Sequence, residues 1–434
     1  MHRAIVCLRP GKYLEWVGER VAAAVGGPEG ASGGRVSLVL APGVDPERAG
    51  IAGLGGERGA EGVELVRIRP GRGLAGVRAF ACPAQRRAMA VYEALRELDA
   101  RAPIGEIVVL DEAGEGFFLA CARASGCAFA DAAIRCERAV VEEDRHAGDA
   151  RTPWTLRDLV VDAMQRHSSA GGECDPGARD AEEVSVVIPH FNDGVHLEEA
   201  VASLEAQSLR PREILLVEDG STDADSLRVV ESLDRAGRVR VVRQENRGLA
   251  AARNTGWRAC DTELVAFLDA DDVVMPGWLA SCARAIGRTG AAAAAPIVAT
   301  FDDDPGTITG GWCPVAFDAA LLGVMNAGVP GSGAVLRRAA LEGVGGFDET
   351  MSAYEDWALS AALAARRESL AVVPEALFRY RQRAGSLIRR TGRPNHDRWR
   401  AIIIARHGIG DDGRVAQALL DEMSRLRGRL KRQR

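Results

Sequence analysis

Three acidic residues within four positions, Asp269, Asp271 and Asp272, have the clearest capacity for chemistry in this chain. They follow a short apolar run at residues 265–268, and Pro276 comes soon after them. Such a run, stopped by acids and a proline, indicates a buried strand that ends in a loop. Carboxylates this close stay ionised only beside positive charge, most simply a hard divalent metal such as Mn²⁺ or Mg²⁺. A second interpretation is open here: a turn whose last acid caps a helix that begins near Pro276.

Other polar residues follow short apolar runs in the way that Asp269 does. Three such runs alternate with helical patterns between residues 184 and 254, and the first two lead into Pro189 and into the acids around Asp219. Right-handed crossovers put the ends of such strands on one edge of one sheet, so we expect Pro189, Asp219 and Asp269 to converge there. Taken alone, residues 219–223 could be a turn with a helix cap.

The residue types at this edge suit a nucleotide diphosphate. Asp219 can accept a hydrogen bond from the N–H of a uracil-like base, and Phe191 offers a ring face beside it. Asp271 can hold a metal that bridges two phosphates, and Arg253 adds a fixed positive charge nearby. The pattern therefore predicts a site for a nucleotide diphosphate and a metal.

Residues 184–385 resemble an inverting family-2 glycosyltransferase of the GT-A fold. The elements that carry the resemblance follow one another in order: residues 186–189 with Phe191 and Asn192, residues 218–223, Asn246 and Gly248 with residues 252–256, residues 267–272, residues 345–349 and residues 354–357. The resemblance implies an α/β fold with a mixed sheet and helices on both faces. It also implies transfer of a sugar from a nucleotide-diphosphate donor, UDP-linked, to a hydroxyl of a glycan, a lipid-linked molecule or a protein, as in polysaccharide assembly.

The resemblance implies roles on the donor side for the residues that match. Asp219 would read the base, with Pro189 and Phe191 beside it. Asp269 would contact the ribose or phosphate side, and Arg253 would lie near the diphosphate.

The metal and the base are also assigned by the resemblance. Asp271 would bind Mn²⁺ or Mg²⁺, and Asp356, the second acid of the family's Glu-Asp pair at the start of a helix, would be the catalytic base. In a single displacement this base takes the proton of the acceptor hydroxyl, while the metal and Arg253 absorb charge on the departing diphosphate. Standing alone, residues 355–356 could be a simple helix cap.

The chain departs from the family pattern in two places. Glu218 stands where the family commonly has Asp, a tolerable change because Asp219 carries the base contact. After the last strand the family often has a His, but residues 380–383 read Tyr-Arg-Gln-Arg. A metal ligand or phosphate contact from that His is therefore missing, and Arg383 could bind the diphosphate instead.

The first part of the chain predicts a separate Rossmann-like α/β domain. Short apolar runs at residues 4–8, 36–40 and 107–110 alternate with helical patterns, which is typical of a parallel sheet with helices on both faces. The glycine-bearing segment 111–116 follows a strand, where open α/β sheets bind ligands, although an ordinary tight connection is the alternative. This part shows a slight resemblance to the N-terminal half of a GT-B glycosyltransferase.

The predicted organisation has four parts: a Rossmann-like domain at 1–170, a linker at 171–183, a GT-A catalytic domain at 184–389 and a helical extension at 390–434. Within the catalytic domain, residues 300–347 should build the acceptor side. Trp312 and the loop at 329–333 are candidates to face a sugar, and Trp312 could equally be core.

Composition sets limits on partners and location. A net charge of −6 over 434 residues argues against a general nucleic-acid binder. The nine cysteines form no C-x-x-C pair, which fits a reducing cytoplasm. No stretch reaches the roughly 18 apolar residues of a membrane span, and no signal region opens the sequence. The basic residues 425–432 allow at most peripheral contact with the inner face of a membrane, with a solvated helix end as the alternative.

Two rival functions are open at this stage. The same pocket could belong to a catalytically idle module that binds a nucleotide sugar or acts as a scaffold, although degenerate copies tend to lose one or both of Asp271 and Asp356. A sugar nucleotidyltransferase would need a Gly-rich loop with Arg and Lys after the first strand, and residues 190–193 do not supply one.

Overall fold

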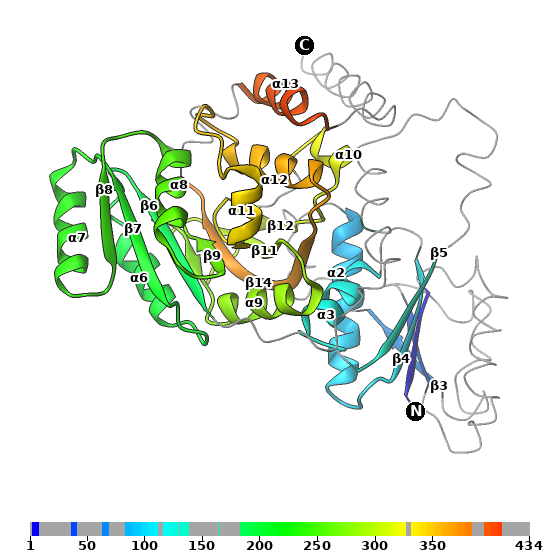
Figure 1. Cartoon of the computed structure of the whole chain (residues 1–434). Coiled ribbons are helices and arrows are strands. Elements are labelled where there is room, and N and C mark those ends of the chain that lie inside the picture. The colour runs from blue at the N-terminus through cyan, green and yellow to red at the C-terminus, as the bar shows by residue number, and fades with distance from the viewer. Residues whose placement is uncertain are drawn as a thin grey trace, which may run out of the picture. The chain divides into compact units, whose positions relative to one another are not determined.

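The chain divides into two compact units (Figure 1). In the computed structural model the described residues are 2–7, 36–40, 63–68, 83–111, 116–129, 131–138, 164, 183–326, 331–383 and 395–409. The first unit holds those up to 138 together with Met164, and the second holds those from 183 on. The predicted linker at 171–183 lies outside the described residues except for its last residue, so its position stays a prediction.

The first unit is built on a sheet in which every described strand runs parallel to its neighbours, in the order β3-β2-β1-β4-β5. Its elements are β1 (Arg3–Val6), β2 (Val36–Leu40), β3 (Val63–Arg67), α2 (Pro83–Asp99), β4 (Glu106–Asp111), α3 (Phe117–Ser125) and β5 (Ala133–Arg138). This is the strand order of a doubly wound dinucleotide-binding sheet. The predicted Rossmann-like α/β architecture is confirmed.

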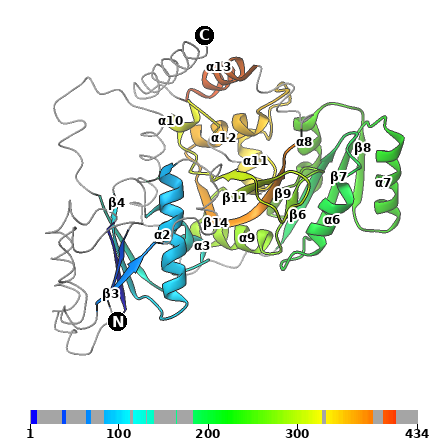
Figure 2. The same cartoon turned by 180° about the vertical axis from the view of Figure 1, so that it is seen from behind.

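Helices α2 and α3 lie side by side on one face of this sheet (Figures 1 and 2). The residues that the structure describes include no helix on the other face, so cover on both faces stays a prediction for this unit. Of the glycine-bearing segment 111–116, only the two end residues are described.

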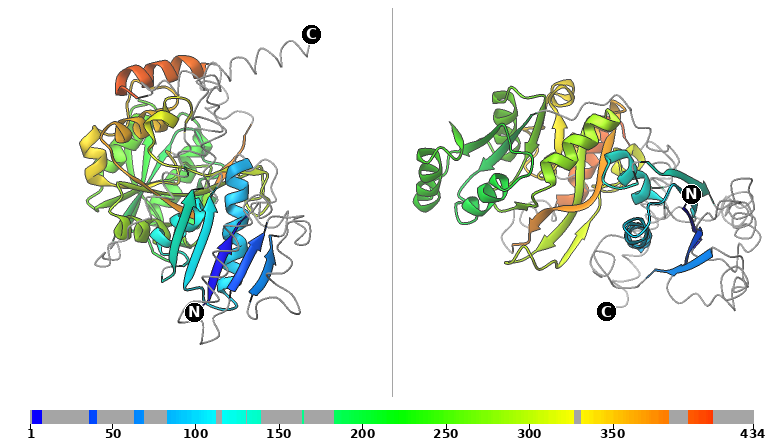
Figure 3. Two further views of the ribbon diagram at one scale, coloured as in Figure 1. Left: turned by 90° about the vertical axis from the view of Figure 1, so that its right-hand side faces the viewer. Right: turned by 90° about the horizontal axis from the view of Figure 1, so that it is seen from below.

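The second unit is built on a mixed sheet, which can be followed from two further sides in Figure 3. Its order is β10-β14-β11-β13-β9-β6-β7-β8, with β12 beside β11. The strands are β6 (Val184–His190), β7 (Glu213–Asp219), β8 (Arg240–Gln244), β9 (Leu264–Phe267), β10 (Val273–Val274), β11 (Ala293–Phe301), β12 (Gly310–Trp312), β13 (Val335–Arg337) and β14 (Leu370–Arg381). Strands β9, β6, β7 and β8 are parallel, and β13 runs antiparallel to β9 and β11.

Helices cover the sheet of the second unit. They are α6 (Leu197–Glu205), α7 (Ala224–Arg235), α8 (Leu249–Ala259), α9 (Trp278–Thr289), α10 (Ala319–Leu322), α11 (Arg338–Val344), α12 (Glu355–Ala365) and α13 (His396–His407). Helix α8 packs on β6 and β7 and α9 on β11 and β14. At Gly256 of α8 an added Cβ would lie 2.2 Å from Cγ1 of Val187, so glycine permits this close approach.

The parallel strands end at a common edge. In the register of β6 and β7, Pro189 lies beside Val217 and His190 beside Glu218, and β9 ends at Phe267, just before the acidic loop. The pairing of β6 with β9 stops at Val187, so Pro189, which has no N–H, breaks no hydrogen bond there. The predicted convergence of these strand ends is confirmed.

The described part of the C-terminal extension is α13, which packs on α12. None of the helices in the described ranges combines the length and the apolar character needed to cross a membrane.

Candidate active site

Asn192 holds the loops after β6 and β7 together. Its Oδ1 accepts hydrogen bonds from the backbone N–H groups of Thr222 and Asp223, each at 2.8 Å, and its own N–H donates to Oγ of Ser221 at 3.0 Å. Its φ of +50° lies in the left-handed region that Asn tolerates. The neighbouring Phe191 is 47% exposed, which leaves its ring free to stack on a ligand.

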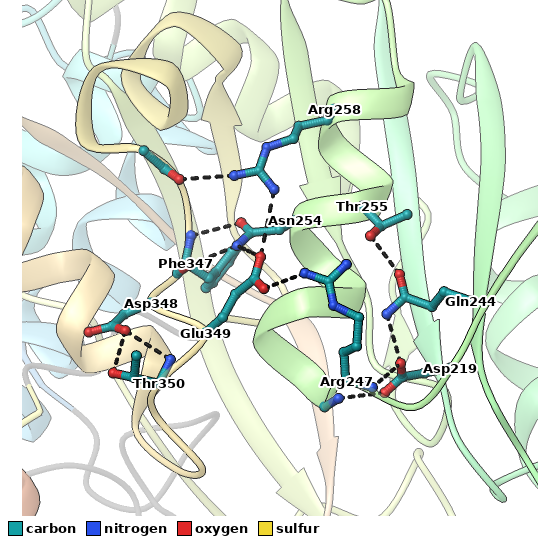
Figure 4. A network of polar contacts seen from close by, with 12 residues as sticks. Asp219, Gln244, Arg247, Asn254, Thr255, Arg258, Phe347, Asp348, Glu349 and Thr350 are labelled. Carbon is teal, nitrogen blue, oxygen red and sulfur yellow. Dashed lines mark hydrogen bonds and ion pairs between the residues drawn. The ribbon is translucent and has the colours of Figure 1, made fainter.

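Asp219 lies at the end of β7 and is only 2% exposed. Its carboxylate accepts hydrogen bonds from Nε2 of Gln244 at 2.7 Å and from the backbone N–H groups of Arg247 and Gly248, each at 2.9 Å (Figure 4). A carboxylate accepts about four hydrogen bonds, so about one position remains for a base. The helix cap that sequence alone allowed at 219–223 is supplied by Asp223, whose Oδ2 accepts from the N–H of Ser226.

Asn254 fastens α8 to the segment at 345–349 (Figure 4). It exchanges hydrogen bonds with the backbone of Phe347, donating at 2.8 Å and accepting at 2.9 Å, and its Nδ2 also donates to Glu349 at 2.9 Å. Glu349 in turn accepts from Arg247 at 2.6 Å. At Gly346 (φ +86°) a Cβ would lie 2.4 Å from Oδ1 of Asn254, so this contact depends on glycine.

Arg253 of α8 is 2% exposed and joins two separate segments. Its Nη2 donates to Oδ1 of Asp269 at 2.8 Å and its Nη1 to Oε1 of Glu355 at 2.7 Å. Burial alone would lower the pKa of Arg253, but Asp269 and Glu355 outweigh burial and raise the pKa. A Cβ at Gly331 would lie 2.6 Å from Nη1, so backbone approaches the guanidinium closely. Both terminal nitrogens thus bind acids of the chain itself.

The three acids within residues 269–272 have three different sets of partners. Asp269 pairs with Arg253, and Asp271 pairs with Nη2 of Arg383 at 2.6 Å. Asp272 is fully buried and accepts from the backbone N–H of Arg381 at 3.0 Å and from Ser332 at 3.2 Å. Guanidinium groups of the protein therefore pair with Asp269 and Asp271, whereas Asp272 is bound by neutral donors.

Asp272 does not cap the following helix. Helix α9 begins at Trp278, and its N-cap, Gly277, has no side-chain cap. The acidic loop does form a turn, in which the N–H of Asp272 donates to the carbonyl oxygen of Asp269 at 3.1 Å, but the predicted cap is wrong. Burial, and then Asp271 and Asp269, raise the pKa of Asp272 well above its usual range.

Asp271 and Asp269 are the acids of this loop that keep some exposure to solvent. Burial, and then the charge of Asp269, raise the pKa of Asp271 to about 6. Within the described ranges no three acids, histidines or cysteines lie close enough together to hold a metal by themselves. A metal bound at Asp271 would need further oxygens from a ligand or from water.

Asp356 lies in the first turn of α12, beside Glu355 and its ion pair with Arg253. Its Oδ2 accepts from Nδ2 of Asn326 at 3.0 Å and its Oδ1 from the N–H of Trp357 at 2.8 Å. The N-cap of α12 is Tyr354, without a side-chain cap. Burial, and then Glu355, raise the pKa of Asp356 to about 6, a suitable range for a general base.

The structure brings most of the predicted site residues together and adds Asn326, which sequence analysis did not single out. Arg253 connects the Asp269 loop with the Glu355–Asp356 pair, and Asn326 holds the Asp356 carboxylate. Asn326 lies inside the segment expected to build the acceptor side, but no local pattern marks it.

Trp312 packs edge-on against Tyr380, with ring centroids 5.5 Å apart, and keeps partial exposure. The proposal that it faces a sugar stays a prediction. The first residues of the loop at 329–333 lie outside the described part of the chain, and the described remainder, from Gly331, lies against Arg253 and Asp356.

Comparison with known families identifies this unit. Residues 185–345 match the sequence model described as "Glycosyl transferase family 2", and residues 319–403 match the one described as "Glycosyltransferase like family 2". This part of the chain belongs to glycosyltransferase family 2, and its mixed sheet is the GT-A fold, as predicted.

Several curated relatives carry the name glycosyltransferase. The pre-mycofactocin glycosyltransferase of Mycobacterium tuberculosis is 34% identical over 219 residues, which is 46% of this chain and 42% of that protein. The uncharacterized glycosyltransferase EpsJ of Bacillus subtilis is 40% identical over 91 residues, 21% of this chain and 26% of that one. Chondroitin synthase of Escherichia coli is 35% identical over 100 residues, which is 23% of this chain and 14% of that protein. The chain thus spans less than half the length of these relatives.

Solved structures of S. aureus TarS are also similar. The form containing residues 1–349 in complex with UDP-GlcNAc is 18% identical, with a TM-score of 0.42 over 54% of this chain and 69% of that one.

The buried ion pairs of Arg253 lead to a prediction about stability. Arg253→Met would leave Asp269 and Glu355 without their counter-charge, so we expect the free energy of unfolding to fall by about 3–5 kcal/mol in urea titrations. Arg247→Met is the matched control, because the Arg247 side chain is 55% exposed and pairs with Glu349 at the surface, where loss should be about 0–1 kcal/mol. Equal losses in the two variants would contradict the central position given to Arg253.

Proposed function

We propose that the second unit is an inverting glycosyltransferase that moves a sugar from a nucleotide-diphosphate donor, UDP-linked, to a hydroxyl acceptor. The observation that carries this proposal is the arrangement around Arg253. Its two ion pairs hold the acidic loop that ends β9 beside the start of α12, which carries Asp356. Membership of glycosyltransferase family 2 supports a nucleotide sugar as the donor.

The donor side of this proposal uses the loops after β6 and β7. The exposed ring of Phe191 would stack on the base, and the backbone of Pro189 would lie beside it. The remaining acceptor position of Asp219 would take the base N–H, while its other bonds keep residues 244–248 in place. Asp269 has one oxygen that is not bound to Arg253, and it would face the ribose or phosphate side.

We also propose that Asp271 holds Mn²⁺ or Mg²⁺. The residues fit such an ion, because Asp271 and Asp269 lie in one loop, both keep some exposure to solvent, and a single nitrogen of Arg383 contacts Asp271. One or two carboxylates together with substrate phosphates is a usual set of ligands for Mg²⁺. When bound, the ion would neutralise charge on the departing diphosphate.

Asp356 would act as the general base. One carboxylate oxygen of Asp356 would take the proton of the acceptor hydroxyl. At the same time the hydroxyl oxygen would form its bond to the anomeric carbon, and the bond from that carbon to the diphosphate would break on the opposite side. Asn326 and the N–H of Trp357 fix the orientation of the carboxylate. Arg253 contributes positive charge from its buried position, since both terminal nitrogens already bind acids.

The acceptor is a glycan, a lipid-linked molecule or a protein hydroxyl, and the name of one relative, chondroitin synthase, favours polysaccharide assembly. An idle binding module would not need a base with its pKa raised to about 6 beside the donor loop. We also propose a cytoplasmic location, with at most peripheral contact with the membrane, because the nine cysteines of the sequence include no C-x-x-C pair.

The first prediction from this mechanism concerns the base. Asp356→Asn keeps the shape of the side chain but cannot accept the proton, so turnover should fall about 10²–10⁴-fold while donor binding is retained. Wild-type turnover should fall as the pH drops through about 6, because the protonated Asp356 cannot take a proton. In Asn326→Ala this fall in turnover should begin at a higher pH, because the Asn326 amide lowers the pKa of Asp356.

Asp304→Asn, at an exposed acid, is the control and should leave turnover unchanged. Turnover of Asp356→Asn above about a tenth of wild type would refute the assignment.

The second prediction concerns the metal. Calorimetric binding of UDP should be lost in excess EDTA and should return with Mn²⁺ or Mg²⁺, because the diphosphate would otherwise meet Asp269 and Asp271 without a bridging cation. Binding of UDP that is undiminished in EDTA would exclude a metal-dependent donor site.

A further inference from the structure

Arg383, two residues beyond the end of β14, lies between two carboxylates. Its Nη1 donates to Oδ1 of Asp193 at 2.9 Å, and its Nη2 donates to Oδ2 of Asp193 at 2.5 Å. The same Nη2 lies 2.6 Å from Oδ2 of Asp271. One guanidinium therefore bridges the loop after β6 and the acidic loop after β9.

The two contacts of Arg383 are unequal. Asp193 is held by a fork of two parallel N–H···O bonds, the geometry in which a guanidinium binds a carboxylate best. Asp271 is held through one nitrogen that it shares with Asp193. If another cation takes Asp271, Arg383 can stay on Asp193 and lose a single contact.

Arg381, two residues earlier, cannot exchange its partners in this way. It is buried, its Nε donates to the backbone carbonyl of Asp271 at 2.8 Å, and its Nη2 donates to Glu199 at 2.5 Å. Arg383, by contrast, has a side chain that is 37% exposed. Of these two arginines, Arg381 is held by its buried contacts and Arg383 is more exposed. Of the two, only Arg383 contacts a carboxylate of the acidic loop through its side chain.

We infer that Arg383 is a displaceable counter-cation: it occupies Asp271 in the donor-free protein and yields it to the divalent metal that arrives with the nucleotide diphosphate. While the fork to Asp193 stays in place, the freed N–H of Nη2 turns to the diphosphate. Asp193 is thus a positioning residue that keeps Arg383 within reach. This inference rests on the proposed function, because it takes Asp271 as the metal ligand.

The arrangement has a thermodynamic consequence. Metal alone must compete with Arg383 for Asp271, whereas metal that arrives with a diphosphate gives Arg383 a new anion to bind. Metal and nucleotide should therefore strengthen the binding of each other, and by the same factor in both directions.

The test measures Mn²⁺ binding without nucleotide by calorimetry. Arg383→Gln should bind Mn²⁺ about ten-fold more tightly than wild type, because the competing charge is gone. The same variant should bind UDP about ten-fold more weakly at saturating Mn²⁺, because the guanidinium no longer reaches the diphosphate. Arg383→Lys, which keeps the charge without the fork, should fall between wild type and Arg383→Gln in both measurements.

The matched control is Arg379→Gln in β14, four residues before Arg383, since Arg379 donates to the backbone carbonyls of Pro305 and Ala376. It should match wild type in both titrations. Equal affinity of wild type and Arg383→Gln for Mn²⁺ would overturn the inference, and so would an equal gain in Arg379→Gln. If either of these results is obtained while the wild type still binds UDP in the presence of Mn²⁺, only the inference about Arg383 is wrong and the proposed function is retained. If neither protein binds Mn²⁺ with or without UDP, both fall.

Discussion

A guanidinium buried at the centre of the second unit sets the geometry of the whole site. Removing the charge of Arg253 from water is costly, and the cost is offset only when the charge meets acids at hydrogen-bonding distance. The fold supplies Asp269 and Glu355, which lie on segments far apart in the sequence. Their attraction to one cation brings the acidic loop and the start of α12 together, and so determines where Asp356 lies relative to Asp271.

The other acids of the site differ in how completely the protein satisfies them. Asp272 is buried and receives a backbone N–H and a hydroxyl, so it serves the structure. Asp219 is also buried, and three donors of its own chain bind it. Asp271 and Asp356, in contrast, keep partial exposure to solvent, and each has its pKa raised to about 6. Incompletely neutralised carboxylates at one sheet edge are where a metal or a proton can be bound.

Much of this arrangement can be predicted from the sequence, because strand ends in a parallel sheet are marked by local signals. Pro189 and Asp269 follow apolar runs, and the rule for crossovers then places them at one edge. The contact between Arg383 and Asp193 cannot be predicted in this way, because the two residues are 190 positions apart. Nothing in either local segment indicates that they form an ion pair, and the same is true of Asn326 and Asp356.

Asp272 and Arg253 show the limits of inference from residue type. An acid that follows a strand can cap a helix or bind a metal. Asp272 does neither: it is buried and accepts hydrogen bonds from the backbone of β14 and from Ser332. Arg253 was expected as a fixed positive charge near the diphosphate, and the sequence did not indicate that its terminal nitrogens bind Asp269 and Glu355. In both cases the deciding partners come from distant strands and helices, which composition and periodicity do not reveal.

The most direct test of the account is to incubate the protein with Mn²⁺ and a panel of nucleotide sugars and to follow the released sugar by NMR. The account predicts slow hydrolysis of one UDP-linked donor, with the free sugar appearing first in the anomeric configuration opposite to that of the donor. Release with retained configuration, or no consumption of any donor, would contradict a single displacement at this site.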